Sequence, residues 1–378
     1  MKKLLFLAVA SLFVFTACNQ TPQDGYLIKG KIQGDFIISE EITGDVILTN
    51  RNRNAADLIS DTTHIERGKF TFKGKIDTPE MYYLEIIGTK TSIPFFLENA
   101  QFSVDVTVDD YKNAQIVGGE SQTIYSKITE FNKGIDVKYG LDNLMKEYRD
   151  SVTTKERRGE ISDIYSKASE EKSSFRKETL ESAPQTSYFI FNEIAAGMAY
   201  NSLEELEEKF APFKEDAKFI DGRNYKKING QIEGLKKLQP GMPAPDFTQN
   251  TPEGKPISLS SVYSKNKVTM IDFWAGWCGP CRQFNPKLVE IYKKYHKRGF
   301  EILGVSFDNN RETWLKAIKD DKLPWIHVSE IKYWDTEPRH LYMINFIPNN
   351  AFVDSNGNII ARQLDKDKIE ELLEEHLK

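Results

Sequence analysis

The chain has 378 residues, of which 39% are hydrophobic, and its formal net charge is −5. This length exceeds one typical domain, so we expect two or three domains with sizeable cores. Because the charge balance is acidic and no basic stripe runs along the chain, nucleic acid is not an expected partner.

The first 17 residues have the pattern of an export signal. Two lysines precede an apolar stretch of about a dozen residues, which is shorter than the roughly 18 that a membrane-spanning helix needs. Ala17 then comes directly before Cys18. Residues 15–18 resemble the end of a bacterial lipoprotein signal, which implies lipidation of Cys18, a tether over residues 18–25 and a periplasm-facing place in the bacterial cell envelope. The alternative is an ordinary secretory peptide cleaved nearby, which would leave Cys18 as a free thiol.

An N-terminal antiparallel β domain is expected over residues 26–120. Short runs of alternating apolar and polar residues, such as Tyr26–Ile32, Lys69–Phe72 and Gln101–Val108, are separated by turn residues. This period of two is typical of half-buried strands.

A helical connector is expected over residues 121–238. Strand patterns end there, Lys and Glu become frequent, and apolar residues recur at helical spacing, for example over residues 141–148. Gly159 and Pro184 are expected to interrupt the helices.

The last part of the chain, residues 239–378, has the pattern of an α/β domain with a mixed sheet covered on both faces. The expected order is strand, helix, strand, helix, a loop rich in Trp and Lys, a strand pair and a final helix. The approximate positions of the strands and helices are 268–274, 279–297, 300–307, 312–320, 350–354 with 359–362, and 366–377.

Trp277, Cys278, Gly279, Pro280 and Cys281 form the most informative motif. At the start of a helix the first thiol gains unpaired backbone N–H groups and the positive end of the helix dipole, which favour a reactive thiolate. Pro280 fits the first helical turn, where a missing N–H costs nothing. The chain has three cysteines and five histidines without a second pair at ligand spacing. A structural zinc site and inert packing are therefore the weaker alternatives, and no metal is expected.

The segment from about residue 240 onward resembles the TlpA/ResA-type thiol-disulfide oxidoreductases of the thioredoxin-like, AhpC/TSA-related superfamily. The match lies in Ile271–Arg282, Gly304–Asp308, Leu323–Trp325 and Ile347-Pro348. In residues 26–120, the motifs are Lys69–Gly74, Pro79 with Tyr82–Leu84, Phe95–Asn99 and Val117–Gly119. Through them this stretch resembles the β-rich N-terminal module of unknown function that often precedes such domains in envelope lipoproteins. The resemblance implies an enzyme that exchanges disulfides with protein partners and with an upstream envelope electron donor or acceptor. No cofactor is implied besides the Cys278–Cys281 disulfide.

The resemblance also assigns roles to single residues. Cys278 is the attacking thiolate and Cys281 resolves the mixed disulfide. Asp272, in an otherwise apolar strand, is expected beneath the disulfide, where burial would raise its pKa and let it take the Cys281 proton. The alternative for Asp272 is a carboxylate satisfied by a neighbouring lysine or hydroxyl.

Supporting residues follow from the same resemblance. The Trp277 ring would limit access of water, and Gly279-Pro280 resembles thioredoxin and suggests a reductant. A cis Ile347-Pro348 bond is expected to face the disulfide, with the backbone of Ile347 pairing with a partner like an added strand. Many ResA-like members have a glutamate three residues after the second cysteine, and here that position is Phe284.

Two other functions remain open from the sequence. One is a binding or sensing lipoprotein whose β domain binds a ligand and whose disulfide reports redox state. The other is a peroxiredoxin-like peroxidase, which residues 243–247 suggest, although the Pro-x-x-x-Thr-x-x-Cys arrangement of that nucleophile is absent.

Overall fold

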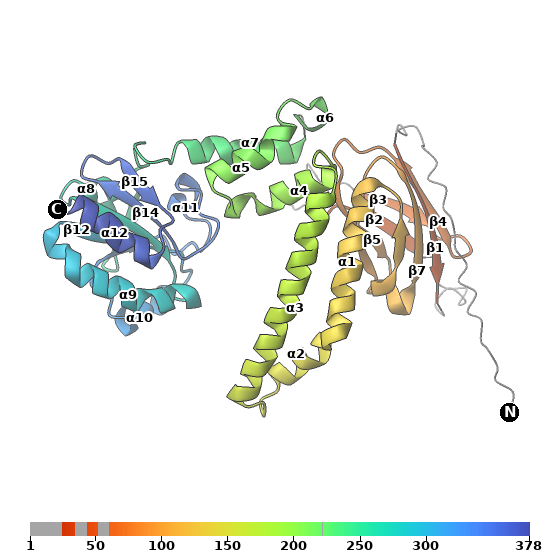
Figure 1. Cartoon of the computed structure of the whole chain (residues 1–378), viewed down its shortest axis with the longest axis horizontal. Helices are drawn as coiled ribbons and strands as arrows, with labels where there is room; N and C mark the ends of the chain where they lie inside the picture. Colours follow the sequence, from red (N-terminus) through yellow and green to blue (C-terminus); the bar gives the residue numbers. More distant parts are fainter. Residues whose placement is uncertain (1–24, 35–43, 52–59, 221) are drawn as a thin grey trace. The chain divides into compact units, whose positions relative to one another are not determined.

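The computed structural model describes residues 25–34, 44–51, 60–220 and 222–378, and its contacts divide the chain into two compact units, Met1–Ile190 and Phe191–Lys378 (Figure 1). The expected signal peptide, Cys18 and the tether up to residue 24 lie outside the described residues. Within the described part, no helix combines the length and apolar character needed to cross a bilayer.

The first unit begins with two four-stranded sheets that share one hydrophobic core. Strands of the sheet ordered β4-β1-β7-β8 are β1 Tyr26–Gln33, β4 Lys69–Gly74, β7 Gln101–Thr107 and β8 Gln115–Val117. Strands of the sheet ordered β3-β2-β5-β6 are β2 Asp45–Thr49, β3 Ser60–His64, β5 Glu80–Ile86 and β6 Ser92–Leu97. The predicted alternation is visible in β1, where Ile28 and Ile32 are buried and Lys29 and Lys31 are exposed. One pair differs from antiparallel pairing, because β1 and β7 run parallel; the long chain between them permits the crossover.

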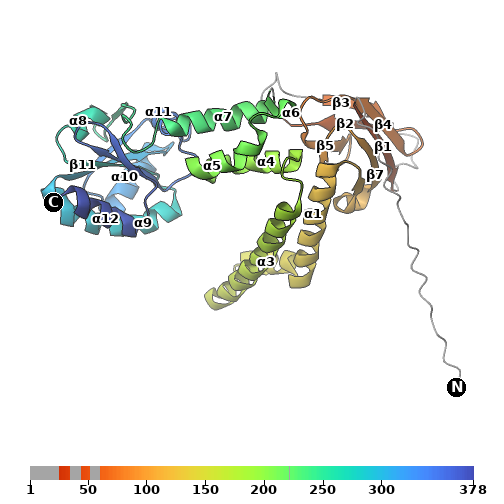
Figure 2. The same cartoon turned by 45° about the horizontal axis from the view of Figure 1, so that its top comes forward.

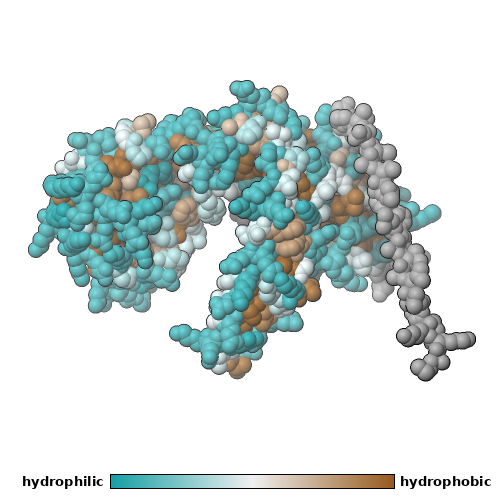
Figure 3. All heavy atoms as spheres, in the orientation of Figure 1, coloured by the Kyte–Doolittle hydropathy of each residue, from teal (hydrophilic) through white to brown (hydrophobic). Residues whose placement is uncertain are grey.

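Three helices complete the first unit: α1 Glu120–Tyr139, α2 Leu141–Arg149 and α3 Lys155–Ser182. Helices α1 and α3 lie side by side in both views (Figures 1 and 2), with the Phe131 and Phe175 rings stacked at 3.7 Å. Hydrophobic side chains are visible along these helices on the face shown in Figure 3.

Two sequence predictions concern interruptions of helix α3, and one of them is wrong. It ends at Ser182, just before Ala183 and Pro184, as expected from the missing N–H of proline. It continues through Gly159, so the predicted interruption there is wrong. A glycine costs about 1 kcal/mol in a helix interior, which a 28-residue helix packed against α1 tolerates.

The second unit begins with short helices. Helix α4 spans Tyr188–Gly197, across the division of the units, and α5 Leu203–Phe210, α6 Ala217–Ile220 and α7 Arg223–Lys236 follow. Phe191, Phe210, Phe213 and Phe219 pack around one another and are fully buried. These helices therefore have an aromatic core of their own.

A seven-stranded mixed sheet forms the rest of this unit, in the order β10-β9-β13-β12-β11-β14-β15. The strands are β9 Thr248–Asn250, β10 Pro256–Ser258, β11 Val268–Trp274, β12 Phe300–Ser306, β13 Ile326–Ser329, β14 Asn349–Asp354 and β15 Ile359–Arg362. The helices are α8 Leu259–Tyr263, α9 Gly279–Tyr295, α10 Arg311–Asp320, α11 Glu337–Leu341 and α12 Lys366–His376. The predicted series of β sheets, helical middle and mixed α/β domain is confirmed.

Helix α9 lies between two neighbours on one face of this sheet. Arg282 of α9 pairs with Asp321, which follows α10, and Lys287 of α9 pairs with Glu370 of α12 at 2.6 Å; α9 and α12 are adjacent in both views (Figures 1 and 2). The loop predicted between the helix 312–320 and the strand 350–354 is wrong in part, because that stretch contains β13 and α11. Strand β13 has four residues, and His327 interrupts its apolar pattern, so its sequence gives little strand signal.

Candidate functional site

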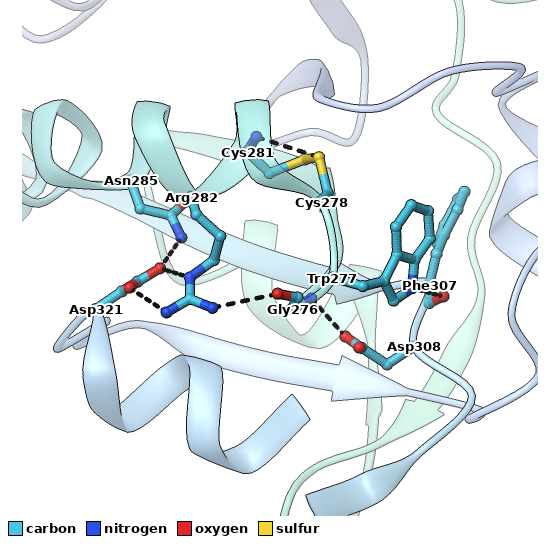
Figure 4. The surroundings of a disulfide bond; sticks show 9 residues. All are labelled: Gly276, Trp277, Cys278, Cys281, Arg282, Asn285, Phe307, Asp308 and Asp321. Carbon is cyan, nitrogen blue, oxygen red and sulfur yellow. Dashed lines mark hydrogen bonds and ion pairs between the residues drawn. A yellow bond between two sulfur atoms is a disulfide. The ribbon is translucent and has the colours of Figure 1, made fainter. Parts of the chain in front are cut away.

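Cys278 and Cys281 form a disulfide at the start of α9 (Figure 4). The fully buried strand β11 ends at Trp274, and a short loop leads to Cys278, the N-cap residue of the helix. The backbone N–H of Cys281 donates to Sγ of Cys278 at 3.1 Å, and Pro280 lies in the first turn. Sγ of Cys278 is thus placed where a helix end stabilises negative charge. Both cysteines are buried, with 3% and 1% of their surface exposed.

The loop before Cys278 is held by Asp308, to which the sequence analysis gave no role. Oδ2 of Asp308 accepts hydrogen bonds from the backbone N–H of Gly276 at 2.8 Å and from the Ser306 hydroxyl at 2.7 Å. A Cβ on Gly276 would lie 2.9 Å from the Cβ of Ala317, so glycine is required for this close approach.

A second carboxylate, Asp321, holds the first turn of α9 (Figure 4). Arg282 donates to it through both Nε and Nη2, the latter at 2.7 Å, and Asn285 donates to it at 2.7 Å. Arg282 also donates to the carbonyl of Gly276 at 3.2 Å. We call Arg282, Asn285, Asp308 and Asp321 the anchoring cluster. Asp321 lies 39 residues from Arg282 in the chain, and no motif in the sequence indicates this pairing.

Trp277 lies at the surface beside the disulfide and is 45% exposed. Its indole Nε1–H donates to the carbonyl of Phe307 at 3.2 Å (Figure 4), and its ring contacts that of Tyr333 at 5.2 Å. The ring is therefore fixed in orientation while one side remains open to a partner.

Asp272 lies in the centre of β11 and is 2% exposed. Its Oδ2 has no hydrogen-bond partner among the described residues, so no described lysine or hydroxyl satisfies this oxygen. Burial raises the pKa of the carboxyl from 3.8 to about 7, because desolvation penalises the charged form. This carboxyl therefore changes its protonation state near neutral pH.

Asp272 belongs to a row of buried residues that cross four neighbouring strands. The strand register pairs Asp272 with Asn350 of β14 and with Gly304 of β12, and pairs Gly304 in turn with His327 of β13. Paired residues of adjacent strands project from the same face of a sheet. We call Asn350, Asp272, Gly304 and His327 the buried row. His327 was missed by the sequence analysis, because one histidine in a short strand carries no recognisable motif.

The buried row faces α9. Trp274, two residues after Asp272 and hence on the same face, contacts the His327 ring at 5.6 Å. Trp325, beside His327 at 5.8 Å, contacts Tyr292 of α9 at 5.6 Å. Phe273, on the opposite face, contacts Tyr342 instead. The helix that carries Cys281 therefore covers the face from which Asp272 projects.

The Ile347-Pro348 peptide bond is cis, as predicted, and Pro348 lines a groove of about 960 Å³ beside the disulfide motif. Its apolar part consists of Pro280, Phe284, Phe346, Pro348 and Leu364, and its polar part of Gln283, Lys287, Asn349, Asn350, Gln363, Asp365, Lys366 and Asp367. Phe284, at the position of the missing glutamate, thus adds apolar surface to this groove.

No cluster of three or more possible metal ligands occurs in the described ranges. The polar groups around the disulfide are instead the anchoring cluster and the buried row. Their arrangement suits sulfur and proton transfer, which need a thiol at a helix end and a carboxyl that titrates near neutral pH.

The comparisons with known proteins agree with this chemistry. Residues 266–359 match the family described as Thioredoxin-like, and residues 26–125 match a domain of unknown function, DUF4369. The thiol-disulfide oxidoreductase ResA of Bacillus anthracis is 30% identical over 154 residues, which cover 39% of this chain and 83% of the relative. A probable nucleoredoxin 1 of Arabidopsis thaliana is 34% identical over 141 residues, 36% of this chain but 23% of the relative.

Among solved structures, the thioredoxin domain of a thiol-disulfide oxidoreductase from Bacteroides vulgatus is 33% identical and covers 37% of this chain and 99% of that domain, with a TM-score of 0.35. The sheet, the helix-capping disulfide and the matching family define a thioredoxin-like domain behind an N-terminal DUF4369 domain. The chain belongs to the TlpA/ResA-type thiol-disulfide oxidoreductases.

Proposed function

We propose that this protein is tethered in the bacterial cell envelope and reduces disulfides of protein partners through Cys278 and Cys281. The observation that carries the proposal is the position of Cys278 as the N-cap of α9, with its Sγ accepting the Cys281 N–H at 3.1 Å. When the disulfide is reduced, the same N–H and the helix dipole favour a thiolate at Cys278 over one at Cys281.

The exchange has two steps. The Cys278 thiolate attacks one sulfur of the partner's disulfide, and the other partner sulfur leaves as a thiolate. Cys281, one helical turn away and buried, then loses its proton and attacks Sγ of Cys278. The Cys278–Cys281 disulfide forms, the partner leaves with two cysteines reduced, and the protein is oxidised by two electrons.

Asp272 is the proton acceptor for Cys281 in this proposal. It projects toward α9, Oδ2 has no partner in the described part of the chain, and its pKa of about 7 lets it both take and return a proton near neutral pH. No acidic residue occupies the position of Phe284, so the proton has no second carboxyl in that turn of α9.

The groove beside Pro348 is the place where the partner binds. An extended segment of the partner pairs with the backbone of Ile347 as an added strand, and its side chains contact Pro280, Phe284 and Phe346. Phe284 makes this groove more apolar than a glutamate would, so we expect partners with apolar residues beside the reacting cysteine.

Enzyme assays test the exchange. Wild type reduces insulin with dithiothreitol as the electron source, Cys278→Ser does not, and Cys281→Ala accumulates mixed disulfides through Cys278. Acid-quenched alkylation in cells tests the direction, since a reductant rests with both thiols reduced. Absence of turnover in wild type, or of any adduct in Cys281→Ala, would contradict the proposal.

The tether is tested separately. We expect Cys18→Ser to move the protein from the membrane fraction to the soluble fraction and to leave insulin reduction unchanged. A variant that remained with the membrane would show that Cys18 is not the anchor, without affecting the exchange chemistry.

A further inference from the structure

His327 is a buried titratable residue that has no role in the exchange proposed above. It is 4% exposed, and neither ring nitrogen has a hydrogen-bond partner among the described residues. The backbone of Leu323 is close enough to the ring to act on its pKa as a hydrogen-bond partner, although outside strict hydrogen-bond geometry, so at least one ring nitrogen remains unpaired among the described residues. Since buried polar atoms are nearly always paired in folded proteins, the imidazole requires an explanation.

The imidazole extends along the buried row over Gly304, the residue paired with His327 on one side and with Asp272 on the other. A Cβ built on Gly304 would lie 2.7 Å from Nδ1 of His327 and 3.1 Å from Nε1 of Trp325, so these atoms fill the space that glycine leaves open. Adjacent strands are about 4.8 Å apart, and Gly304 lies one strand from each partner. Because Gly304 is on β12, which lies between β13 and β11, the ring of His327 reaches roughly half of the way from β13 to β11.

The other neighbours of the row do not offer a competing charge. The indole N–H groups of Trp274 and Trp325, which contact the ring, are donors without a partner in the described ranges. On α9, Tyr292 contacts Trp325, and burial raises its pKa. Glu301 lies beyond Tyr292 and accepts a hydrogen bond from Ile302. Asp272 is therefore the titratable residue aligned with the imidazole.

We propose that His327 is a positioning residue for disulfide exchange, whose neutral imidazole accepts a hydrogen bond from one water that in turn accepts a hydrogen bond from the protonated Asp272 carboxyl. The inference rests on the proposed role of Asp272. When Cys281 gives its proton to the Asp272 carboxylate, the new O–H donates to this water, and the water donates to Nδ1 of His327. The Cys281 thiolate forms its bond to Cys278, and the partner's sulfur leaves with the electron pair of the broken S–S bond.

Burial keeps His327 neutral in this arrangement. It lowers the pKa of the imidazole from 6.5 to about 3, because a buried cation is poorly solvated. The ring can therefore accept a hydrogen bond at neutral pH without taking the proton from Asp272, whose pKa is about 7. Because the pKa of Asp272 lies well above that of His327, the proton stays on the carboxyl, which donates, and the imidazole accepts.

Nuclear magnetic resonance of the full chain labelled with ¹⁵N-histidine tests this hydrogen bond. Only five histidines contribute signals, so the resonances of His327 can be told apart from the others. We expect the Nδ1 resonance of His327 to remain that of a neutral ring and to shift with a midpoint near pH 7, as Asp272 titrates. In Asp272→Asn this shift disappears. A His327 signal that is constant from pH 5 to pH 9 in wild type, or that shifts equally in Asp272→Asn, would overturn the inference.

Kinetics of the second step provide an independent readout. We expect release of the partner from the Cys278 mixed disulfide to be about tenfold slower in His327→Leu, which removes the acceptor, and near wild type in His327→Gln, which retains one. The first attack by Cys278 is unchanged in both. A histidine that serves packing alone would give the opposite order, because leucine suits an apolar core better than glutamine. His296→Gln, a partly exposed histidine of the same domain, is the matched control.

The failure of the inference and that of the proposed function give different results. If Asp272→Asn releases the partner as fast as wild type, the proposed acceptor role of Asp272 fails. If Asp272→Asn is slow while His327→Leu is normal and the NMR shift is absent, only the role of His327 fails. Should His327→Leu fold poorly, the comparison of wild type with Asp272→Asn by NMR still decides.

Discussion

The anchoring cluster and the buried row both support the disulfide, and their titratable groups are hydrogen-bonded to different degrees. In the anchoring cluster, both oxygens of Asp321 and Oδ2 of Asp308 accept hydrogen bonds, while Oδ1 of Asp308 has no partner among the described residues. In the buried row, Oδ2 of Asp272 and both ring nitrogens of His327 have no partner among the described residues. Satisfied carboxylates fix geometry, whereas unsatisfied titratable groups respond to protons. The two regions thus separate positioning of the thiols from proton transfer.

The sharpest test of this difference is the pH dependence of stability. The folded-state pKa of Asp272, about 7, lies above its ordinary value of 3.8, so its stabilising contribution is lost as pH rises from about 4 through 7. The folded-state pKa of His327, about 3, lies below its ordinary value of 6.5, so its contribution is lost as pH falls from about 6.5 through 3. In wild type these two effects oppose each other between about pH 4 and pH 6.5.

Single substitutions should therefore reveal opposite slopes. Relative to wild type, we expect Asp272→Asn to gain stability as pH rises from 4 to 6.5 and His327→Leu to lose it, each by on the order of 3 kcal/mol over that range. All five tryptophans lie between residues 274 and 334, so tryptophan fluorescence during urea unfolding reports on this domain alone. Parallel slopes in the two variants would refute the assignment of the row as a proton-responsive site.

The next largest effect is expected in the anchoring cluster. Asp321→Ala leaves Arg282 and Asn285 without their acceptor, and loss of hydrogen bonds to a charged group costs about 2 kcal/mol. Asp320→Ala is the matched control, because Asp320 is the neighbouring acid and mainly contacts exposed Lys316; we expect a change below about 0.5 kcal/mol. Equal losses in urea unfolding would show that Asp321 does not anchor α9.

The sequence predicted those parts of the protein that are determined by residues close together in the chain. Strand β11 was predicted with its observed bounds because the mostly apolar run Val268–Trp274 comes shortly before a helix-capping motif. The position of Cys278 at the helix start followed from Pro280 and the spacing of the two cysteines. Asp272 could be singled out because it is a carboxylate inside an apolar run.

The missed residues depend on contacts between distant parts of the chain. Asp321 contacts α9 across 39 residues, and His327 enters the buried row only through the register of β12 with β13. Neither the pairing of two strands nor such a salt bridge produces a periodic pattern of residues in the sequence. Gly304 was part of a matched motif, yet its purpose, an open space filled by the His327 ring, becomes visible only when three strands are side by side.

The smallest predicted effect tests how tightly the anchoring cluster packs around the active-site loop. A Cβ at Gly276 would lie 2.9 Å from the Ala317 Cβ and 3.2 Å from Oδ1 of Asp308, so Gly276→Ala must shift α10 or the loop, at a cost of about 1 kcal/mol. Gly279→Ala is the matched control for stability, because nothing lies within 4 Å of its Cβ position and alanine favours the helix. Urea unfolding followed by tryptophan fluorescence should therefore show a loss for Gly276→Ala and none for Gly279→Ala. If both variants were as stable as wild type, the loop would have room to move, and the fixed geometry attributed to Asp308 would have to come from the helix alone.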